Sequence, residues 1–99
     1  MVLEMEIAQL RPGMKRVNLE FKVLKKIGER EVTGRYGKRH RVAEFEIEDK
    51  SGKAVMTLWD NRIDGIKRGA RYEIKNGYTT LFRGELRVSV GKYGEIEEK

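Results

Sequence analysis

The stretch Ala54-Val55-Met56-Thr57-Leu58-Trp59 divides by alternation into the two faces of a predicted β-strand. Ala54, Met56 and Leu58 fall on the face that we expect to pack into a core. Trp59, the only tryptophan of the chain, falls on the other face. A large aromatic side chain in that position is either covered by a neighbouring segment or left open as a surface on which a nucleic-acid base stacks.

The composition describes a small and strongly basic chain. Its 99 residues suit one domain with one core, and its apolar and charged fractions are both 38%. Lys and Arg number 22 against 16 Asp and Glu, which gives a net charge of +6. A basic domain of this size suggests an anionic partner, with nucleic acid as the first candidate. The alternative is a highly charged surface without such a partner.

The composition also argues against several classes of protein. The chain has no cysteine, so neither disulfides nor thiolate metal ligands are expected. Its first residues are acidic where a signal peptide is basic, and no apolar run reaches membrane-spanning length. We therefore expect a cytoplasmic protein without a membrane partner, nucleoid-associated if it binds DNA. The expected state is a monomer or a weak oligomer.

Alternation and turn residues predict five strands along the chain. We expect the strands at residues 17–27, 41–48, 54–59, 71–82 and 86–90. A short helix at 62–66, capped by Asp60-Asn61, separates the third strand from the fourth. A polar connection, 28–40, is long for a plain turn, so we expect it to be functional or mobile.

The ends of the chain have separate predicted roles. Within the N-terminal segment 1–14, a short helix or turn brings Leu3, Ile7 and Leu10 together as a plug on one end of the β-domain. Residues 91–94 are a predicted loop, and residues 95–99 form a charged tail. The whole chain, 1–99, is predicted to be a single domain.

The phase of each strand predicts which side chains enter the core. The predicted inward positions include Val17, Leu19, Phe21, Val23, Ile27, Ala43, Phe45, Ile47, Tyr72 and Ile74. On the second strand, Val42 and Glu44 are expected to point outward. Gly77 marks a bulge or bend in the fourth strand, so the phase beyond it stays open.

Five strands with a short helix between the third and fourth are typical of the OB barrel, an all-β fold with little α-helix. The alternative is a small barrel of the SH3 type, which does not require a helix at that point. We therefore predict a five-stranded OB barrel.

Several segments resemble a known family, in the family's own order. They are Ile7-Ala8-Gln9-Leu10-Arg11-Pro12-Gly13-Met14, Val17-Asn18-Leu19, Val55–Trp59, Ile66-Lys67-Arg68-Gly69 and Lys75–Leu86. Together they make the chain similar to the single-stranded DNA-binding (SSB) OB domains of archaea, both single-domain SSB proteins and the repeated domains of replication protein A. Such SSB proteins usually continue into a Gly-rich, acidic-ended tail. This chain stops at Lys99, so we expect a tail-less or shortened protein or one module of a larger one.

The resemblance implies that three aromatic side chains stack bases: Trp59, Tyr78 and Phe82. Stacking contributes about 1–3 kcal/mol per base without reading sequence. Tyr78 stands where relatives often have Trp, so somewhat weaker binding is expected there. Tyr36, in the 28–40 connection, is a further stacking candidate. The alternative for the three implied platforms is core packing, and for Tyr36 a mobile loop tip.

Basic side chains near these aromatics are candidates for phosphate contacts. One group lies in the 28–40 connection and at the following strand edge: Arg35, Lys38, Arg39 and Arg41. A second group flanks the expected stacking surface: Lys75, Arg83, Arg87 and Lys92. The alternative for each is one half of a surface ion pair.

No pattern indicates catalysis or a cofactor. His40 is the only histidine, and no other ligands are spaced around it for a metal ion. Asp49 and Asp60 are explained by a turn and a helix cap. Gly34-Arg35-Tyr36-Gly37-Lys38 is too short for a phosphate-binding P-loop and lacks the following Ser or Thr. We expect no enzyme, no cofactor and no metal.

The sequence therefore predicts a sequence-tolerant single-stranded DNA-binding protein for replication, recombination and repair, which covers about 4–6 nucleotides. Single-stranded RNA is the alternative ligand, because stacking does not distinguish the two sugars. A second alternative is a protein-interaction OB subunit of a complex like replication protein A, with replication or repair proteins as partners.

Overall fold

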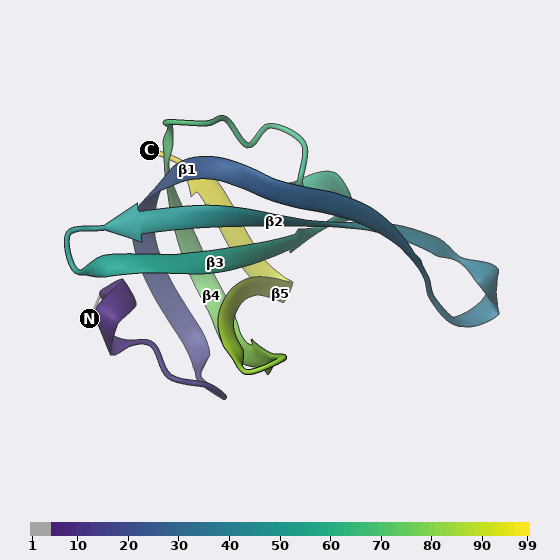
Figure 1. Ribbon diagram of the computed structural model, residues 1–99, viewed down its shortest axis with the longest axis horizontal. Helices are drawn as coiled ribbons and strands as arrows, with labels where there is room; N and C mark the ends of the chain where they lie inside the picture. Colours follow the sequence, from purple (N-terminus) through teal and green to yellow (C-terminus); the bar gives the residue numbers. More distant parts are fainter. Residues whose placement is uncertain (1–4) are drawn as a thin grey trace.

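A computed structural model of the chain describes residues 5–99, and almost all of its regular structure is β (Figure 1). The strands are β1 (Lys15–Thr33), β2 (Arg39–Asp49), β3 (Gly52–Trp59), β4 (Arg71–Phe82) and β5 (Glu85–Glu98). Short 3-10 turns are η1 (Ile7–Gln9), η2 (Arg35–Gly37) and η3 (Asp60–Arg62). Within residues 5–99, no helix has the length and apolar character that crossing a membrane requires.

The strands close into a barrel in the order β1-β2-β3-β5-β4, with β4 pairing back onto β1. Every neighbouring pair is antiparallel except β3 and β5. That parallel ladder is short and runs from Val55↔Arg87 to Thr57↔Ser89. This arrangement confirms the predicted five strands and the chain order expected of an OB fold.

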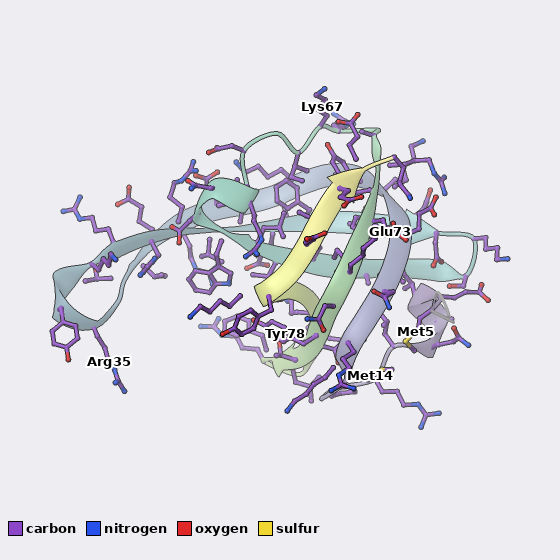
Figure 2. All side chains as sticks on the ribbon, turned by 180° about the vertical axis from the view of Figure 1, so that it is seen from behind. Met5, Met14, Arg35, Lys67, Glu73 and Tyr78 are labelled. Atoms are coloured by element: carbon purple, nitrogen blue, oxygen red, sulfur yellow. The ribbon has the colours of Figure 1, made fainter. Side chains whose placement is uncertain are left out.

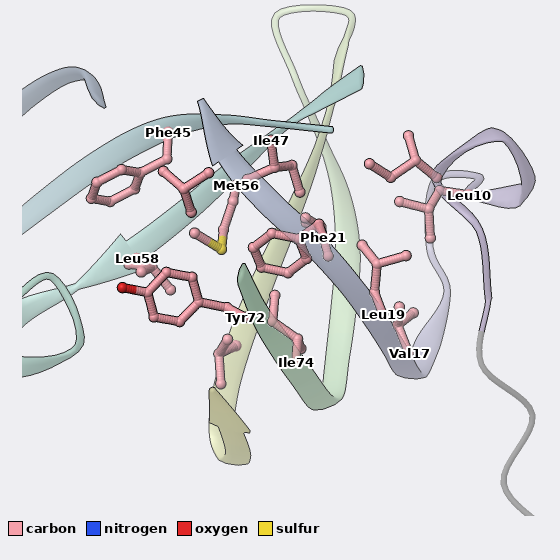
Figure 3. Packing of buried hydrophobic residues seen from close by; sticks show 14 of the residues in the cluster. Leu10, Val17, Leu19, Phe21, Phe45, Ile47, Met56, Leu58, Tyr72 and Ile74 are labelled. Carbon is pink, nitrogen blue, oxygen red and sulfur yellow. The ribbon is translucent and has the colours of Figure 1, made fainter. Parts of the chain in front are cut away.

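The interior of the barrel holds the apolar side chains that alternation assigned to it (Figure 3). Fully buried members include Val17, Leu19, Phe21, Ile47, Met56, Leu58 and Ile74. Ala54 is partly buried against the same cluster. Trp59, out of phase with this set, stays 40% exposed, as its position in the alternation predicts.

The segment before β1 packs its apolar side chains against the core of the barrel. Ile7 and Leu10 are buried in the core, while Leu3 lies outside the described residues. The backbone N–H of Ile7 donates to Asp49 Oδ2 at 2.8 Å. Burial alone would raise the pKa of Asp49, but hydrogen bonds from Ser51, Ile7 and Gly52 outweigh it and lower that pKa. Asp49 therefore ties η1 to the β2–β3 turn.

The predicted helix at 62–66 is wrong. The structure has only the single 3-10 turn η3, although Ile63 is buried in the core below it. Asp60 has a positive φ of 53° and does not cap the turn through its side chain. Its Oδ1 instead accepts the backbone N–H of Arg41 at 3.0 Å, which joins η3 to β2.

The predicted connection at 28–40 is mostly strand. β1 and β2 stay paired as far as Thr33↔Arg39, so they form a long hairpin that projects from the barrel (Figure 1). Ile27, predicted to point inward, is 50% exposed. The ladder changes register between Val23 and Lys25 and again between Lys26 and Gly28, which breaks the alternation that placed Ile27 in the core.

The C-terminal residues are also strand rather than loop and tail, because β5 continues to Glu98. Ile96 pairs with Ile74 and packs against the core. Between the pairs Gly77↔Val90 and Lys75↔Glu95, residues 91–94 of β5 face only Asn76 of β4. We call residues 91–94 the β5 bulge.

A register break at Gly77 decides which way the second half of β4 faces. Before it, Tyr72 and Ile74 are buried, and after it Thr79 is buried instead. The even-numbered side chains thus change from the inner to the outer face across the break. The register break confirms the bulge predicted at Gly77. Glycine permits the close packing at this position, because a Cβ there would lie 2.7 Å from Ile74 Cγ2.

Gly77→Ala should lower the free energy of unfolding by about 1–3 kcal/mol, because the added methyl overlaps Ile74 and also the Ser89 carbonyl, 2.8 Å away. Urea unfolding measures the change. Gly28→Ala is the matched control, since nothing lies within 4 Å of a Cβ at that position. Equal effects of the two substitutions would contradict this account of the bulge.

Candidate nucleic-acid interface

A groove of about 250 Å³ crosses the outer face of the barrel. Its lining residues come from all five strands: Arg30, Val42, Glu44, Thr57, Trp59, Tyr78, Thr80, Phe82, Arg87 and Ser89. The aromatic residues Trp59, Tyr78 and Phe82, singled out for stacking, line this one groove together. None of the three belongs to the core cluster.

Trp59 and Tyr78 line the groove from strands on opposite sides of β5. Tyr78 pairs with Ser89, and Ser89 pairs with Thr57 on β3. Two residues further along these strands are Gly91 and Trp59. A Cβ on Gly91 would lie 3.3 Å from the Tyr78 ring, so the absent side chain leaves room for that ring.

Val42 forms part of the groove beneath this aromatic pair. It points outward, as predicted, and it is the cross-strand partner of Trp59. Its exposed fraction is only 1%, yet it lies outside the core cluster. Large neighbouring side chains on the outer face therefore bury it, and it supports the Trp59 side of the groove.

Phe82 lies at the other end of the groove and is 43% exposed. Guanidinium carbons lie near its ring centroid at 5.2 Å for Arg87, 5.3 Å for Arg83 and 6.0 Å for Arg30. Cations at these distances are attracted to an aromatic face. Phe82 therefore sits among arginines while part of its surface remains open.

Glu44 holds two of these arginines. Its Oε1 accepts a hydrogen bond from Arg30 Nη1 at 2.8 Å, and its Oε2 pairs with Arg87 Nη1. The side chains of Glu44 and Arg87 are both largely buried. The hydrogen bond from Arg30 lowers the pKa of Glu44 most; burial opposes this, and Arg87 lowers the pKa further. Glu44 is thus an ionised carboxylate within the groove.

The β1–β2 hairpin holds other predicted contacts far from the groove. Arg35 lies at the hairpin tip, well away from Tyr78 on the barrel (Figure 2). Tyr36 is fully exposed beside it, with a positive φ of 63°. Lys38 follows, and Arg39 Nη1 lies 3.9 Å from Glu31. The structure separates this basic cluster from the aromatic groove.

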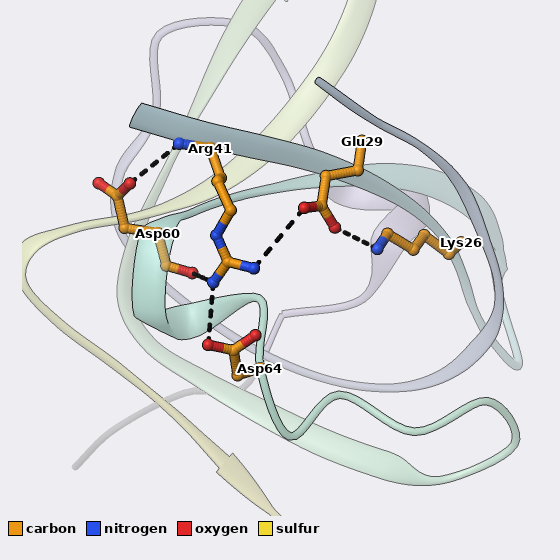
Figure 4. Close-up of polar contacts among 5 residues, drawn as sticks. All are labelled: Lys26, Glu29, Arg41, Asp60 and Asp64. Carbon is orange, nitrogen blue, oxygen red and sulfur yellow. Dashed lines mark hydrogen bonds and ion pairs between the residues drawn. The ribbon is translucent and has the colours of Figure 1, made fainter. Parts of the chain in front are cut away.

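Arg41 is engaged by the protein itself (Figure 4). Its Nη2 donates to Asp64 Oδ2 at 2.9 Å and to the Asp60 carbonyl at 3.1 Å, and its Nη1 lies 3.6 Å from Glu29. The hydrogen bond to Asp64 is the main cause of its raised pKa. Arg41 connects the base of the hairpin to the segment after η3.

The second basic group is also divided between roles. Lys75 Nζ lies 3.8 Å from Glu97 and 4.0 Å from Glu73. Arg87 pairs with Glu44, as described above. Arg83 lies over Phe82, at the edge of the groove. Lys92 Nζ lies 5.6 Å from the ring centroid of Tyr93 on the β5 bulge.

Sequence reasoning missed two residues that line the groove, Arg30 and Glu44, and one exposed aromatic outside it, Tyr93. Arg30 fell in the predicted connection, where no strand phase assigned it a face. Glu44 was placed outward, but an acidic residue is not an obvious choice for an anion-binding face. Tyr93 was assigned to a loop, although an aromatic beside Lys92 was a visible signal.

His40 lies beside a carboxylate at the start of η3. Its Nδ1 lies 3.0 Å from Asp60 Oδ2, and Asp60 in turn accepts the Arg41 backbone N–H. The Arg41 hydrogen bond, followed by that of His40, lowers the pKa of Asp60. Across residues 5–99, no group of three or more His, Cys, Asp or Glu side chains is arranged to hold a metal ion.

Comparison with known proteins gives a consistent family match. The model of the family "Single-stranded DNA binding protein Ssb-like, OB fold" matches residues 10–98. Single-stranded DNA binding protein Ssb of Saccharolobus solfataricus is 30% identical over 96 residues, which cover 97% of this chain and 64% of that protein. The chain thus spans less than two thirds of the length of this relative.

Solved structures share the fold at lower sequence identity. The second OB-fold domain of replication protein A from Methanococcus maripaludis has a TM-score of 0.79 at 22% identity, covering 97% of this chain and 94% of that one. The replication factor A related protein from Methanobacterium thermoautotrophicum has a TM-score of 0.81 at 20% identity, with coverages of 98% and 91%.

Glu44→Gln should lower the free energy of unfolding by about 3 kcal/mol near neutral pH, because it removes the buried carboxylate that pairs with Arg87 and leaves only the more exposed Glu85, 3.5 Å from Arg87 Nε. Since folding lowers the pKa of Glu44 below its ordinary 4.5, its contribution is full above pH 4.5 and is lost as pH falls through the folded value. Urea unfolding across acidic pH measures both effects.

Glu46→Gln is the matched control. Glu46 lies on the same strand two residues away and makes no ion pair within the described part of the chain. We expect it to change stability by less than about 0.5 kcal/mol. A Glu44 variant no less stable than this control, or a difference that persists in acid, would rule out the paired carboxylate.

Proposed function

This chain belongs to the Ssb-like family of OB-fold single-stranded DNA-binding proteins, and from that premise we propose that it binds single-stranded DNA in the outer groove. The observation that supports this most is the convergence of Trp59, Tyr78 and Phe82, from β3 and β4, on one groove. An ordinary core would bury such rings, whereas these keep open surface outside the core cluster.

Bases are proposed to stack on the three rings, and the groove offers little that would read their identity. Thr57, Thr80 and Ser89 supply hydroxyls between the rings, and hydroxyls both donate and accept hydrogen bonds. Stacking tolerates every base because every base has an aromatic face. The proposed binding is therefore tolerant of sequence and suited to strands exposed during replication, recombination and repair, which would place the protein at the nucleoid.

Phosphates are proposed to meet basic side chains at one end of the groove and on the projecting hairpin. Arg83, beside Phe82, lies at one end, and the projecting hairpin with Arg35, Lys38 and Arg39 adds a separate positive surface. Arg41, Arg87 and Lys75 already pair with carboxylates, so we assign them to structural support. Replication and repair proteins remain the proposed partners.

Fluorescence of Trp59, the only tryptophan, should be quenched by oligo-dT and not by duplex DNA, and added salt should weaken binding. Tyr78→Ala and Phe82→Ala should each raise the Kd by about 5- to 150-fold, the equivalent of about 1–3 kcal/mol. A matched oligo-U titration separates DNA from RNA.

Leu81→Ala is the control, because Leu81 is an exposed apolar residue of β4 that does not line the groove. It should bind like the unchanged protein. No quenching, with no mobility shift of the oligonucleotide, would refute the proposal and indicate a protein-binding role for the aromatic face.

Replacing Arg35, Lys38 and Arg39 together by alanine should lower the slope of log K against log salt by about 2, since each lost phosphate contact on a single strand contributes about 0.7. Anisotropy of a labelled oligo-dT at several salt concentrations measures the slope. The triple replacement of Lys22, Lys50 and Arg71, which line a separate cleft, removes the same charge and is the control. Equal slopes for both variants would exclude a hairpin contact.

A further inference from the structure

The β5 bulge presents an aromatic side chain that lies outside the groove. Tyr93 is 81% exposed, and Lys92 Nζ lies 5.6 Å from its ring centroid. An exposed ring of this size is unfavourable because its apolar surface stays in water. Tyr93 belongs neither to the core cluster nor to the lining of the groove, so neither accounts for its position.

Two side chains donate hydrogen bonds to backbone carbonyls of the bulge. Arg62 Nη2 donates to the Gly94 carbonyl at 3.0 Å, and Asn76 Nδ2 donates to the Tyr93 carbonyl at 3.4 Å. A Cβ on Gly94 would lie 2.7 Å from the Asn76 carbonyl oxygen, so the two strands are in close contact there. Tyr93 is therefore attached to the barrel at a defined place, close to η3 and β4.

The β5 bulge lies next to the end of the groove that Tyr78 lines. Phe82, Thr80 and Tyr78 follow one another along the outer face of β4 as far as the register break at Gly77. Asn76, just across that break, donates to the Tyr93 carbonyl, so the bulge lies near the Tyr78 end of the groove. A Cβ on Gly91, at the start of the bulge, would lie 3.3 Å from the Tyr78 ring, so the bulge begins beside the groove.

Two lysine side chains lie near this end of the groove. Lys92 lies on the bulge itself, and the exposed Lys15 of β1 is the cross-strand partner of Tyr78. Directly paired residues project to the same face of a sheet, so Lys15 belongs to the Tyr78 side. An aromatic ring with neighbouring lysines is the combination that binds one nucleotide of a single strand through its base and its phosphate.

We propose that Tyr93 is a further stacking platform and that Lys92 contacts the adjacent phosphate, so that the single-strand site extends past Tyr78 onto the β5 bulge. This inference rests on the proposed function of the groove. It predicts that a longer oligonucleotide gains affinity from a contact that a short one, limited to Trp59, Tyr78 and Phe82, does not reach.

The test measures the Kd of an oligo-dT series of about 3 to 12 nucleotides by anisotropy, with Trp59 quenching followed in parallel. Tyr93→Ala should raise the Kd of the longer oligomers by about 5- to 100-fold and leave the shortest ones unchanged. Tyr93→Phe keeps the ring and should bind every length like the unchanged protein. Lys92→Ala should lower the salt slope by about 0.7 for the longer oligomers alone.

Two results would overturn the inference. If the Tyr93→Ala variant binds oligonucleotides of every length normally, the Tyr93 ring contacts no base. An equal loss at every length would show that Tyr93 acts through the shape of the groove. Failure of the proposed function is distinct, because the unchanged protein would then show neither Trp59 quenching nor binding at any length.

Discussion

The register break at Gly77 is the constraint on which the rest of the binding face depends. Without it, the alternation that buries Tyr72 and Ile74 would continue and would turn Tyr78 and Phe82 into the barrel. The break lets one strand supply the core with its first half and the groove with its second. Because Ile74 and the Ser89 carbonyl lie so close to Gly77, the position leaves no room for a side chain.

Sequence alternation was enough to predict the central strands, because each of them has one face in the core and one in water. It failed for the β1–β2 hairpin, whose residues 25–31 are exposed on both faces, so that no period distinguishes them from a loop. It failed again for the end of β5, where glutamates surround Ile96 and the β5 bulge interrupts the pattern. The sequence singled out the three aromatic side chains that line the groove, whereas the pairing of Arg41 with Asp64 and of Arg87 with Glu44 depends on carboxylates distant in sequence.

Glu44 gives the groove a mixed electrostatic character. A carboxylate on a face proposed to bind an anion weakens the attraction for that anion. It also holds Arg30 and Arg87 beside Phe82 and supplies a counter-charge to the Arg87 guanidinium, which folding removes from water. Among the described residues, Arg35 and Lys38 on the hairpin and Lys92 on the β5 bulge make no ion pair and lie outside the middle of the groove. The middle of the groove is thus suited to bases and its surroundings to phosphates.

The parallel ladder between β3 and β5 is the shortest in the barrel, with three residue pairs. A short ladder has few hydrogen bonds to break, so local opening there costs less free energy than along the longer ladders. Trp59 lies on one side of this seam, and Tyr78 lies beyond it on β4. A ligand in contact with both rings spans the seam, so part of its binding free energy holds the barrel closed, and occupancy and thermal stability rise together.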